Sequence, residues 1–178
     1  MADYLPAILA SAEPDTRLMC AFAAYAGLRC AEIANLDRDD LSLHTIPPVL
    51  AVRAGKGNKD RLVPIHPDLV TLIGKQRPGP LFDVCPKTVG RKIAEHLRGL
   101  GIDATAHQLR HTFGTELARA ADGNVILVAK LMGHENVQTS MNYIGWAGGE
   151  SASVVGRMFP DYPQRPDYND NSPPGMAA

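Results

Sequence analysis

Two short stretches of the sequence place imidazole, guanidinium and phenol groups at spacings that permit joint chemistry. In the stretch HQLRH, His107 and Arg110 lie three positions apart, and His111 follows directly. In a helix this spacing puts His107 and Arg110 on one face, where both can contact the same anion. In GHENVQTSMNY, His134 follows a glycine and Tyr143 comes nine residues later. These stretches therefore supply anion-binding groups, a proton acceptor and a phenolic nucleophile.

Two basic residues earlier in the chain complete this set. Arg29, in AGLRCAEI, follows an expected helix end, and Lys56, in GKGNKDRLVPI, lies in an expected hairpin loop. Two guanidinium groups can neutralise the oxygens of a phosphodiester while a tyrosine attacks its phosphorus. Neither well-placed carboxylates nor a Cys/His metal set accompanies these residues, so we expect phosphodiester chemistry that uses no metal and no cofactor.

Each candidate also has an ordinary structural interpretation. Arg29 can pair with a nearby surface acid such as Glu32, and Lys56 and Lys59 can be solvated loop charges. The two histidines of HQLRH can be buried or capping groups, and Tyr143 can belong to the core. The joint occurrence of all six polar residues in this order favours the chemical interpretation.

Most of the elements that must position these residues are helices. The spacing of apolar residues predicts helices over 13–28, 67–76, 88–100, 107–121 and 125–132, with short ones at 4–10 and near 137–144. A further helix is expected from residue 29, ending in a turn-like stretch, DRDD, at 37–40. Pro47 and Pro48 interrupt this pattern, and β-branched runs at 49–54 and 60–65 around a Gly/Asn-containing loop predict a hairpin. We therefore expect a mainly α fold with a small antiparallel β-sheet (α+β).

Length and composition indicate one globular domain with a tail. The chain has 178 residues, of which 45% are hydrophobic and 21% charged, and residues 160–178 are rich in Pro, Asp, Asn and Gly, which predicts a flexible end. No apolar run of about 18 residues and no basic signal start occur. The three cysteines form no CxxC pair and indicate neither disulfides nor zinc. We expect a cytoplasmic protein without membrane association.

The charge is distributed unevenly along the chain. The formal net charge is −1, but residues 51–100 carry ten Lys and Arg against four Asp and Glu. Such a segment suits contact with a polyanion, the alternative being ordinary solvated surface charge. The basic residues that we expect to contact nucleic acid are Arg53, Lys56, Lys59, Arg61, Lys87, Arg91 and Lys92.

The four stretches together resemble the catalytic domain of the tyrosine recombinases, of the phage integrase and Xer type. The resemblance runs from about residue 26 to residue 144, through AGLRCAEI, GKGNKDRLVPI, HQLRHTFGTEL and LMGHENVQTSMNYI in this order. It implies that fold over residues 1–159 and site-specific DNA recombination through a covalent 3′-phosphotyrosine. The catalytic residues that it implies are Arg29, Lys56, His107, Arg110, His134 and Tyr143.

The resemblance and the side-chain chemistry together assign a role to each residue. The two arginines would bind the non-bridging phosphate oxygens. Tyr143, whose ordinary pKa is about 10, would need a positive field and a proton acceptor, for which His107 is the candidate. Lys56 would protonate the departing 5′-oxygen, and His134 would hydrogen-bond a phosphate oxygen or help to orient Tyr143. His111 would be a structural neighbour of the site.

The resemblance also implies partners and a wider organisation. The expected partners are a double-stranded DNA recombination site, further copies of the protein in a tetrameric synapse and, in some systems, accessory DNA-bending proteins. Relatives usually carry an N-terminal core-binding domain, which we expect to be absent from this chain because it begins almost at the catalytic fold. The stretch 151–159 would form a short helix that packs on a neighbouring protomer or on its own domain. The host compartment would be a bacterial cytoplasm, with a phage or mobile element as the source.

Three other functions remain open from the sequence. The same chemistry would serve a type IB topoisomerase-like enzyme or a telomere resolvase. A DNA-binding accessory domain with a vestigial site would use only the basic hairpin. A metal-dependent hydrolase could use His107, His111 and His134, although carboxylates are not well placed for it.

Overall fold

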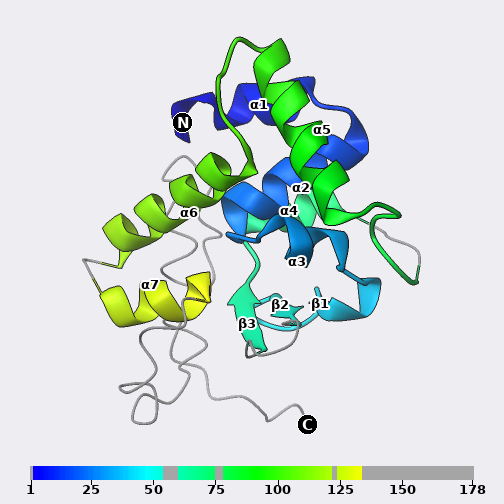
Figure 1. Cartoon of the computed structure of the whole chain (residues 1–178). Helices are drawn as coiled ribbons and strands as arrows, with labels where there is room; N and C mark the ends of the chain where they lie inside the picture. The colour runs from blue at the N-terminus through cyan, green and yellow to red at the C-terminus, as the bar shows by residue number, and fades with distance from the viewer. Residues whose placement is uncertain (1, 54–59, 75–77, 122–123, 134–178) are drawn as a thin grey trace, which may run out of the picture.

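The described part of the chain is a set of packed helices with a small sheet at one side (Figure 1). In the computed structural model, the described residues are 2–53, 60–74, 78–121 and 124–133 (Figure 1). The helices are α1 (Leu5–Ser11), α2 (Pro14–Tyr25), α3 (Cys30–Ala34), α4 (Pro67–Ile73), α5 (Pro86–Gly99), α6 (Ala106–Ala120) and α7 (Val125–Met132), and the strands are β1 (Leu41–Ser42), β2 (Val49–Val52) and β3 (Arg61–Pro64). Short 3-10 turns lie at Ala2–Tyr4 (η1) and Arg38–Asp40 (η2). The predicted mainly α fold with a small antiparallel sheet is confirmed.

The sheet orients the side chains of its third strand. Its order is β1-β2-β3, with antiparallel pairing that places Leu50 opposite Val63 and Val52 opposite Arg61. Successive side chains of a strand point to opposite faces. Leu62 is accordingly 46% exposed, whereas Val63 and Arg61 are buried. The alternation therefore turns the Arg61 side chain towards the helices.

The helix predicted from residue 29 ends at Ala34, and the turn predicted at residues 37–40 is present as η2. The chain then continues into the strand β1, which was not predicted. At the turn, the Asp37 carboxylate accepts the N–H of Asp39, and the Asp40 carboxylate accepts the N–H of Asp37, both at 3.0 Å. Aspartate side chains that bind nearby N–H groups stabilise turns in competition with a helix, which explains the early end.

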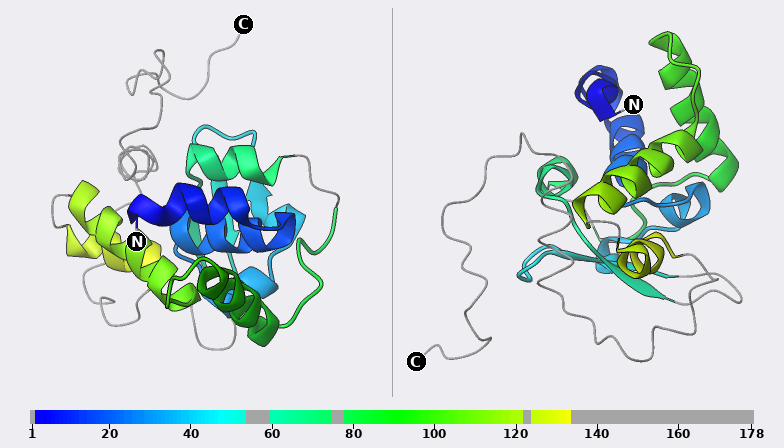
Figure 2. Two further views of the ribbon diagram at one scale, coloured as in Figure 1. Left: turned by 90° about the horizontal axis from the view of Figure 1, so that it is seen from above. Right: turned by 90° about the vertical axis from the view of Figure 1, so that its left-hand side faces the viewer.

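Helix α2 forms the centre of the core. Every residue from 18 to 28 is buried, and α2 packs against α1, α4, α5 and α6 (Figure 2). Alanines at positions 21, 23 and 24 let these helices approach closely, while Phe22 is completely buried. Removing one such aromatic side chain from water contributes about 2–3 kcal/mol. The core thereby holds the end of α2, and the turn after it, in place against α6.

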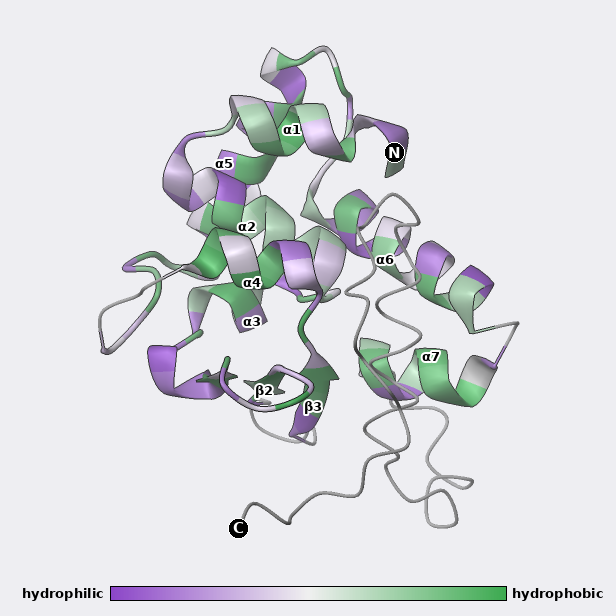
Figure 3. Cartoon of the chain, turned by 180° about the vertical axis from the view of Figure 1, so that it is seen from behind, coloured by the Kyte–Doolittle hydropathy of each residue, from purple (hydrophilic) through white to green (hydrophobic). Residues whose placement is uncertain are grey.

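Helix α7 lies between α6 and the sheet. Its residues VILVAKLM are apolar except for Lys130, and its ribbon is mostly in the hydrophobic colour (Figure 3). It packs against β3 and α6. Leu131 and Met132, at its end, are buried together with Phe113 and Leu117 of α6. This apolar contact fixes the C-terminal end of α7 beside the start of β3.

No helix among the described residues is both long enough and apolar enough to cross a lipid bilayer.

A buried histidine caps the helix that follows the sheet. His66 is fully buried, and its ring stacks on Tyr25 with centroids 4.8 Å apart and an interplanar angle of 9°. Its Nδ1 accepts the N–H of Asp68 at 3.2 Å, as the cap of α4. Burial lowers the pKa of His66 to about 4, against a smaller opposing effect of the Asp68 charge.

This histidine should make folding stability depend on pH. The folded-state pKa of about 4 lies below the ordinary value of about 6.5, so the unfolded chain binds the proton first. The stability that neutral His66 contributes is complete above about pH 6.5 and is lost as the pH falls towards 4. About 1–2 kcal/mol of it is lost between pH 7 and pH 5. Urea unfolding of the wild type and of His66→Gln at both pH values measures this. Equal losses in the two proteins would contradict it.

Candidate active site

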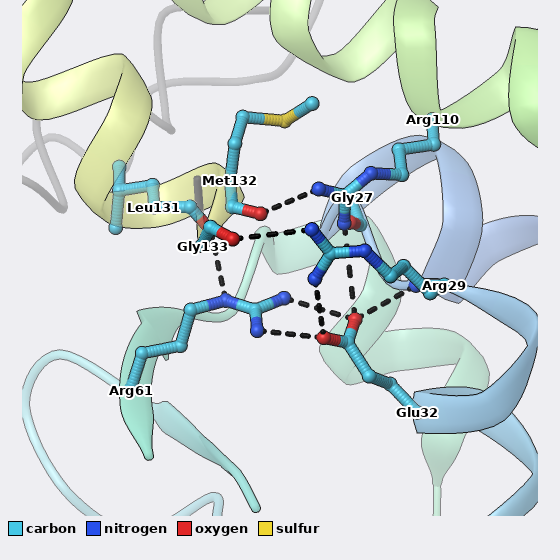
Figure 4. A network of polar contacts seen from close by, with 8 residues as sticks. All are labelled: Gly27, Arg29, Glu32, Arg61, Arg110, Leu131, Met132 and Gly133. Carbon is cyan, nitrogen blue, oxygen red and sulfur yellow. Dashed lines mark hydrogen bonds and ion pairs between the residues drawn. The ribbon is translucent and has the colours of Figure 1, made fainter. Parts of the chain in front are cut away.

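Among the described residues, three arginines from separate elements surround one glutamate (Figure 4). Arg29 precedes α3, Arg61 begins β3, Arg110 lies in α6, and Glu32 lies in α3. The side chains of Glu32, Arg61 and Arg110 are between 7% and 9% exposed, whereas that of Arg29 is 42% exposed. We call these four residues the arginine cluster. Its one open side towards solvent, within the described residues, is therefore at Arg29.

Glu32 is the common acceptor of the cluster. Arg61 donates from both terminal nitrogens, at 2.8 and 3.0 Å, to the two carboxylate oxygens. Arg29 donates through its backbone N–H at 2.7 Å and through Nη1 at 3.1 Å, and Nη1 of Arg110 is 3.8 Å away. Burial would raise the pKa of Glu32, but the hydrogen bonds and charges of Arg61 and Arg29 outweigh it and hold this pKa below its usual value.

Glu32 is not among the predicted site residues. Its place in the sequence indicates only an ordinary ion pair with Arg29, and that pair is present. An acid three positions after the residue that caps a helix start reaches back to the N–H of that capping residue, which is the signal that could have identified Glu32. The partners of Glu32 on β3 and α6 leave no such local signal.

The end of helix α7 supplies the other acceptors. Three consecutive backbone carbonyls accept one guanidinium each: Leu131 from Nε of Arg61 at 3.1 Å, Met132 from Arg110, and Gly133 from Nη2 of Arg29 at 3.1 Å. The last carbonyls of a helix receive no N–H from within the helix, and they carry partial negative charge. Arginine side chains therefore satisfy them and tie α7 to α3, β3 and α6.

Arg110 is held from both sides by backbone. Its Nη1 donates to the carbonyl of Gly27 and its Nη2 to the carbonyl of Met132. Burial, together with the charges of Arg29 and Arg61, lowers its pKa to about 10 against the opposing charge of Glu32. The group therefore remains protonated at neutral pH. These two hydrogen bonds hold the side chain between the turn at Gly27 and the end of α7, and they use two of the five N–H groups of the guanidinium.

A glycine makes the approach of α6 possible. Gly27 has φ +64°, and a Cβ on it would lie only 2.4 Å from a ring carbon of Phe113. Larger residues are excluded at this distance, and positive φ is unfavourable for them. The absent side chain lets Phe113 pack on the turn between α2 and α3, one helical turn from Arg110. Gly27 thus brings Arg110 and Arg29 to the same place.

His107 lies on α6, three residues before Arg110, but the two side chains have different neighbours. Its backbone N–H is capped by Thr105 at 3.3 Å, and its side chain is exposed. Its ring meets that of His111 edge to face, with centroids 4.5 Å apart. The structure thus brings Arg29 and Arg110 together, and pairs His107 with His111 at the surface of the same helix.

The remaining predicted site residues lie outside the described residues. These are Lys56, Lys59, His134 and Tyr143, together with the expected helices near 137–144 and at 151–159 and the expected tail. His134 follows Gly133, the residue whose carbonyl accepts Arg29. Within the described ranges, no three His, Cys, Asp or Glu side chains form a group suited to a metal ion.

Most described basic residues of the predicted DNA-contacting set are exposed. Arg53, just after β2, pairs with Asp40 at 2.6 Å, and its side chain is 68% exposed. On α5, Lys87 and Arg91 are exposed and Lys92 is half-buried.

Arg61 was predicted to contact DNA, but the structure places its side chain in the interior. It is buried, and its guanidinium is directed to Glu32 and Leu131. The alternation of the strand turns it inward, so it belongs to the arginine cluster and does not lie on the outer basic surface.

The chain is similar to known proteins in sequence and in fold. The profile of the phage integrase family matches residues 83–147. A tyrosine recombinase of Thermosipho africanus (strain TCF52B) is 36% identical over 146 residues, which cover 75% of this chain and 50% of that protein. Tyrosine recombinase XerA of Pyrococcus furiosus is 34% identical over 143 residues, covering 71% of this chain and 49% of that protein. The solved integrase from mycobacterium phage Brujita has 28% identity and a TM-score of 0.75, over 92% of this chain and 58% of that chain.

The chain belongs to the tyrosine recombinases of the phage integrase family and corresponds to their catalytic domain. It spans about half the length of the curated relatives that it matches.

Proposed function

We propose that the protein cuts and rejoins DNA at a specific site through a transient covalent bond between Tyr143 and a 3′-phosphate. The observation that carries this proposal is the meeting of Arg29 and Arg110 around Glu32 and the end of α7. Three guanidinium charges against one carboxylate leave a formal charge of +2 in the cluster. Such an excess suits the phosphate of DNA, whose negative charge grows in the transition state.

The proposed reaction needs no metal or cofactor. The phenol oxygen of Tyr143 bonds to phosphorus while its proton passes to His107, and the bond from phosphorus to the 5′-oxygen breaks. Lys56 gives that oxygen its proton. A 5′-hydroxyl then attacks the phosphotyrosine and gives its proton to Lys56, which restores the phosphodiester. His107 returns its proton to the departing tyrosine. The bond energy is conserved in the intermediate, so rejoining needs no nucleotide.

The arginines differ in what they offer the phosphate. Arg110 is immobilised by two carbonyls and would supply a fixed charge. Arg29 is 42% exposed and would contact a non-bridging oxygen directly. His107 is exposed three residues before Arg110, which supports its role as proton acceptor.

The expected partner is double-stranded DNA, bound by the exposed basic residues of α5 and by Arg53, Lys56 and Lys59. We further propose a tetrameric synapse with other copies of the full-length protein, aided in some systems by DNA-bending proteins. Since the substrate is DNA, the proposed site of action is the bacterial cytoplasm, with integration of a phage or mobile element as one outcome.

The test is a nicked suicide duplex from the attachment region of the source genome, incubated with the protein in EDTA. After cleavage the short strand diffuses away, so the intermediate accumulates and is seen on a denaturing gel. We expect an adduct that Tyr143→Phe abolishes and whose DNA-linked peptide contains Tyr143. Adducts that require metal, or that persist in the Phe variant, would overturn the proposal. Joining to a second duplex distinguishes recombination from simple resealing.

A further inference from the structure

We propose that Arg61 is a positioning residue for the cleavage reaction: it locks the start of strand β3 onto Glu32 and onto the end of helix α7. The inference rests on the proposed function, because its effect is exerted on Arg29 and Arg110. Arg61 itself reaches the phosphate only through these neighbours.

The contacts of Arg61 join three elements. Its two terminal nitrogens bind the two oxygens of Glu32 on α3, and its Nε binds the carbonyl of Leu131 on α7. The side chain is only 7% exposed. A planar guanidinium offers donors in a fixed fork, so these bonds define both the distance and the angle between β3, α3 and α7. A lysine at this position would keep the charge but could not reproduce the three directions.

A second observation shows that the space around this guanidinium is closely fitted. Gly133, the residue that ends α7, has φ +64°, and a Cβ on it would lie 2.9 Å from Nη1 of Arg61 and 3.1 Å from its Cζ. The backbone of Gly133 therefore lies directly against the guanidinium plane. The carbonyl of the same residue accepts Arg29 at 3.1 Å. A shift of Arg61 would be transmitted to Arg29 through this one residue.

The contacts of Arg61 lie next in the chain to two segments that contain predicted catalytic residues. Residues 54–59, which include Lys56, connect β2 to β3, and β3 begins at Arg61. At the other end of the contact, His134 follows Gly133 in the sequence. Arg61 thus anchors the backbone next to both segments, and it binds both oxygens of the carboxylate that Arg29 and Arg110 also face.

The inference predicts a loss of rate without a loss of DNA binding. With Arg61→Lys, the rate constant for adduct formation on the suicide duplex should fall about 10- to 100-fold, because small displacements of catalytic groups have effects of this size. The dissociation constant for the same DNA should change less than about threefold, since Arg61 is buried. Arg61→Gln should lower the rate further, because it removes the charge as well.

The end point of the reaction separates positioning from folding. A purely structural role would lower the fraction of protein that ever forms adduct, whereas a positioning role lowers the rate constant at an unchanged final fraction. Arg119→Lys is the matched control: this arginine on α6 is 71% exposed, pairs with Glu116 and lies outside the cluster. Its rate should stay within about twofold of the wild type.

The outcomes distinguish this inference from the proposed function. A wild-type chain that forms no adduct overturns both. An active wild type with a normal rate in Arg61→Lys overturns the positioning role alone. A normal rate constant with a reduced final fraction in both Arg61 variants overturns it as well, because Arg61 would then only support the fold.

Discussion

Replacing Arg110 by methionine should lower the rate of adduct formation about a thousandfold and leave the fold nearly as stable as before. The rate effect follows from the fixed position of this charge. Arg110 is held by the carbonyls of Gly27 and Met132, so folding has already oriented this charge before a phosphate binds. Removing a preoriented donor from a developing negative charge has a large effect because no mobile group replaces it.

The small stability effect follows from the electrostatics around Arg110. Burial and the charges of Arg29 and Arg61 lower its pKa to about 10, so the fold holds this charge at some cost. Methionine relieves that cost and fills similar space, but it leaves two carbonyls without their donor, which is unfavourable. We expect these terms to offset each other to within about 1–2 kcal/mol.

Single-turnover cleavage of the suicide duplex and urea unfolding measure the two effects on the same preparations. Arg110→Lys is the matched variant, because it keeps the positive charge but cannot reproduce both hydrogen bonds to the carbonyls of Gly27 and Met132. Its rate should lie between those of the wild type and the methionine variant. A methionine variant that cleaves within about tenfold of the wild-type rate would contradict the assignment. So would a rate loss that tracks the unfolded fraction.

Replacing Glu32 by glutamine should, unlike the change at Arg110, cause a large loss of stability, about 3–5 kcal/mol. Three guanidinium groups would lose their counter-charge, two of them buried. Buried charges left without a partner are strongly destabilising, whereas an exposed pair contributes little. The lowered pKa of Glu32 has the same cause, since the arginines favour its charged form despite its burial.

Urea unfolding at neutral pH tests this directly. Glu95→Gln is the matched control, because Glu95 pairs with Arg91 at 2.9 Å on the exposed side of α5, where both side chains are more than half exposed. It should change the free energy of unfolding by less than about 1 kcal/mol. Equal losses in the two variants would mean that Glu32 does not stabilise the buried arginines.

Most of the local elements in the described part of the chain, although not the strand β1, could be predicted from the sequence alone. Apolar periodicity, with Pro14 at a helix start and Gly27 after a helix end, located α2, and the β-branched runs on either side of GKGNK located β2 and β3. The order of the four stretches identified the family, and it predicted Arg29 and Arg110 as site residues. Each of these features depends on neighbours in the chain, and patterns over a few residues record such local preferences.

Tertiary packing alone decided how the arginine cluster is built. The strand register turned Arg61 inward, away from the expected basic surface, and Glu32 became the acceptor for residues on three elements. The bond from Arg29 to Gly133 joins positions 104 residues apart. No periodicity in the sequence encodes such a pair, because its partners are chosen by which buried surfaces fit together and which carbonyls remain unsatisfied at the end of α7.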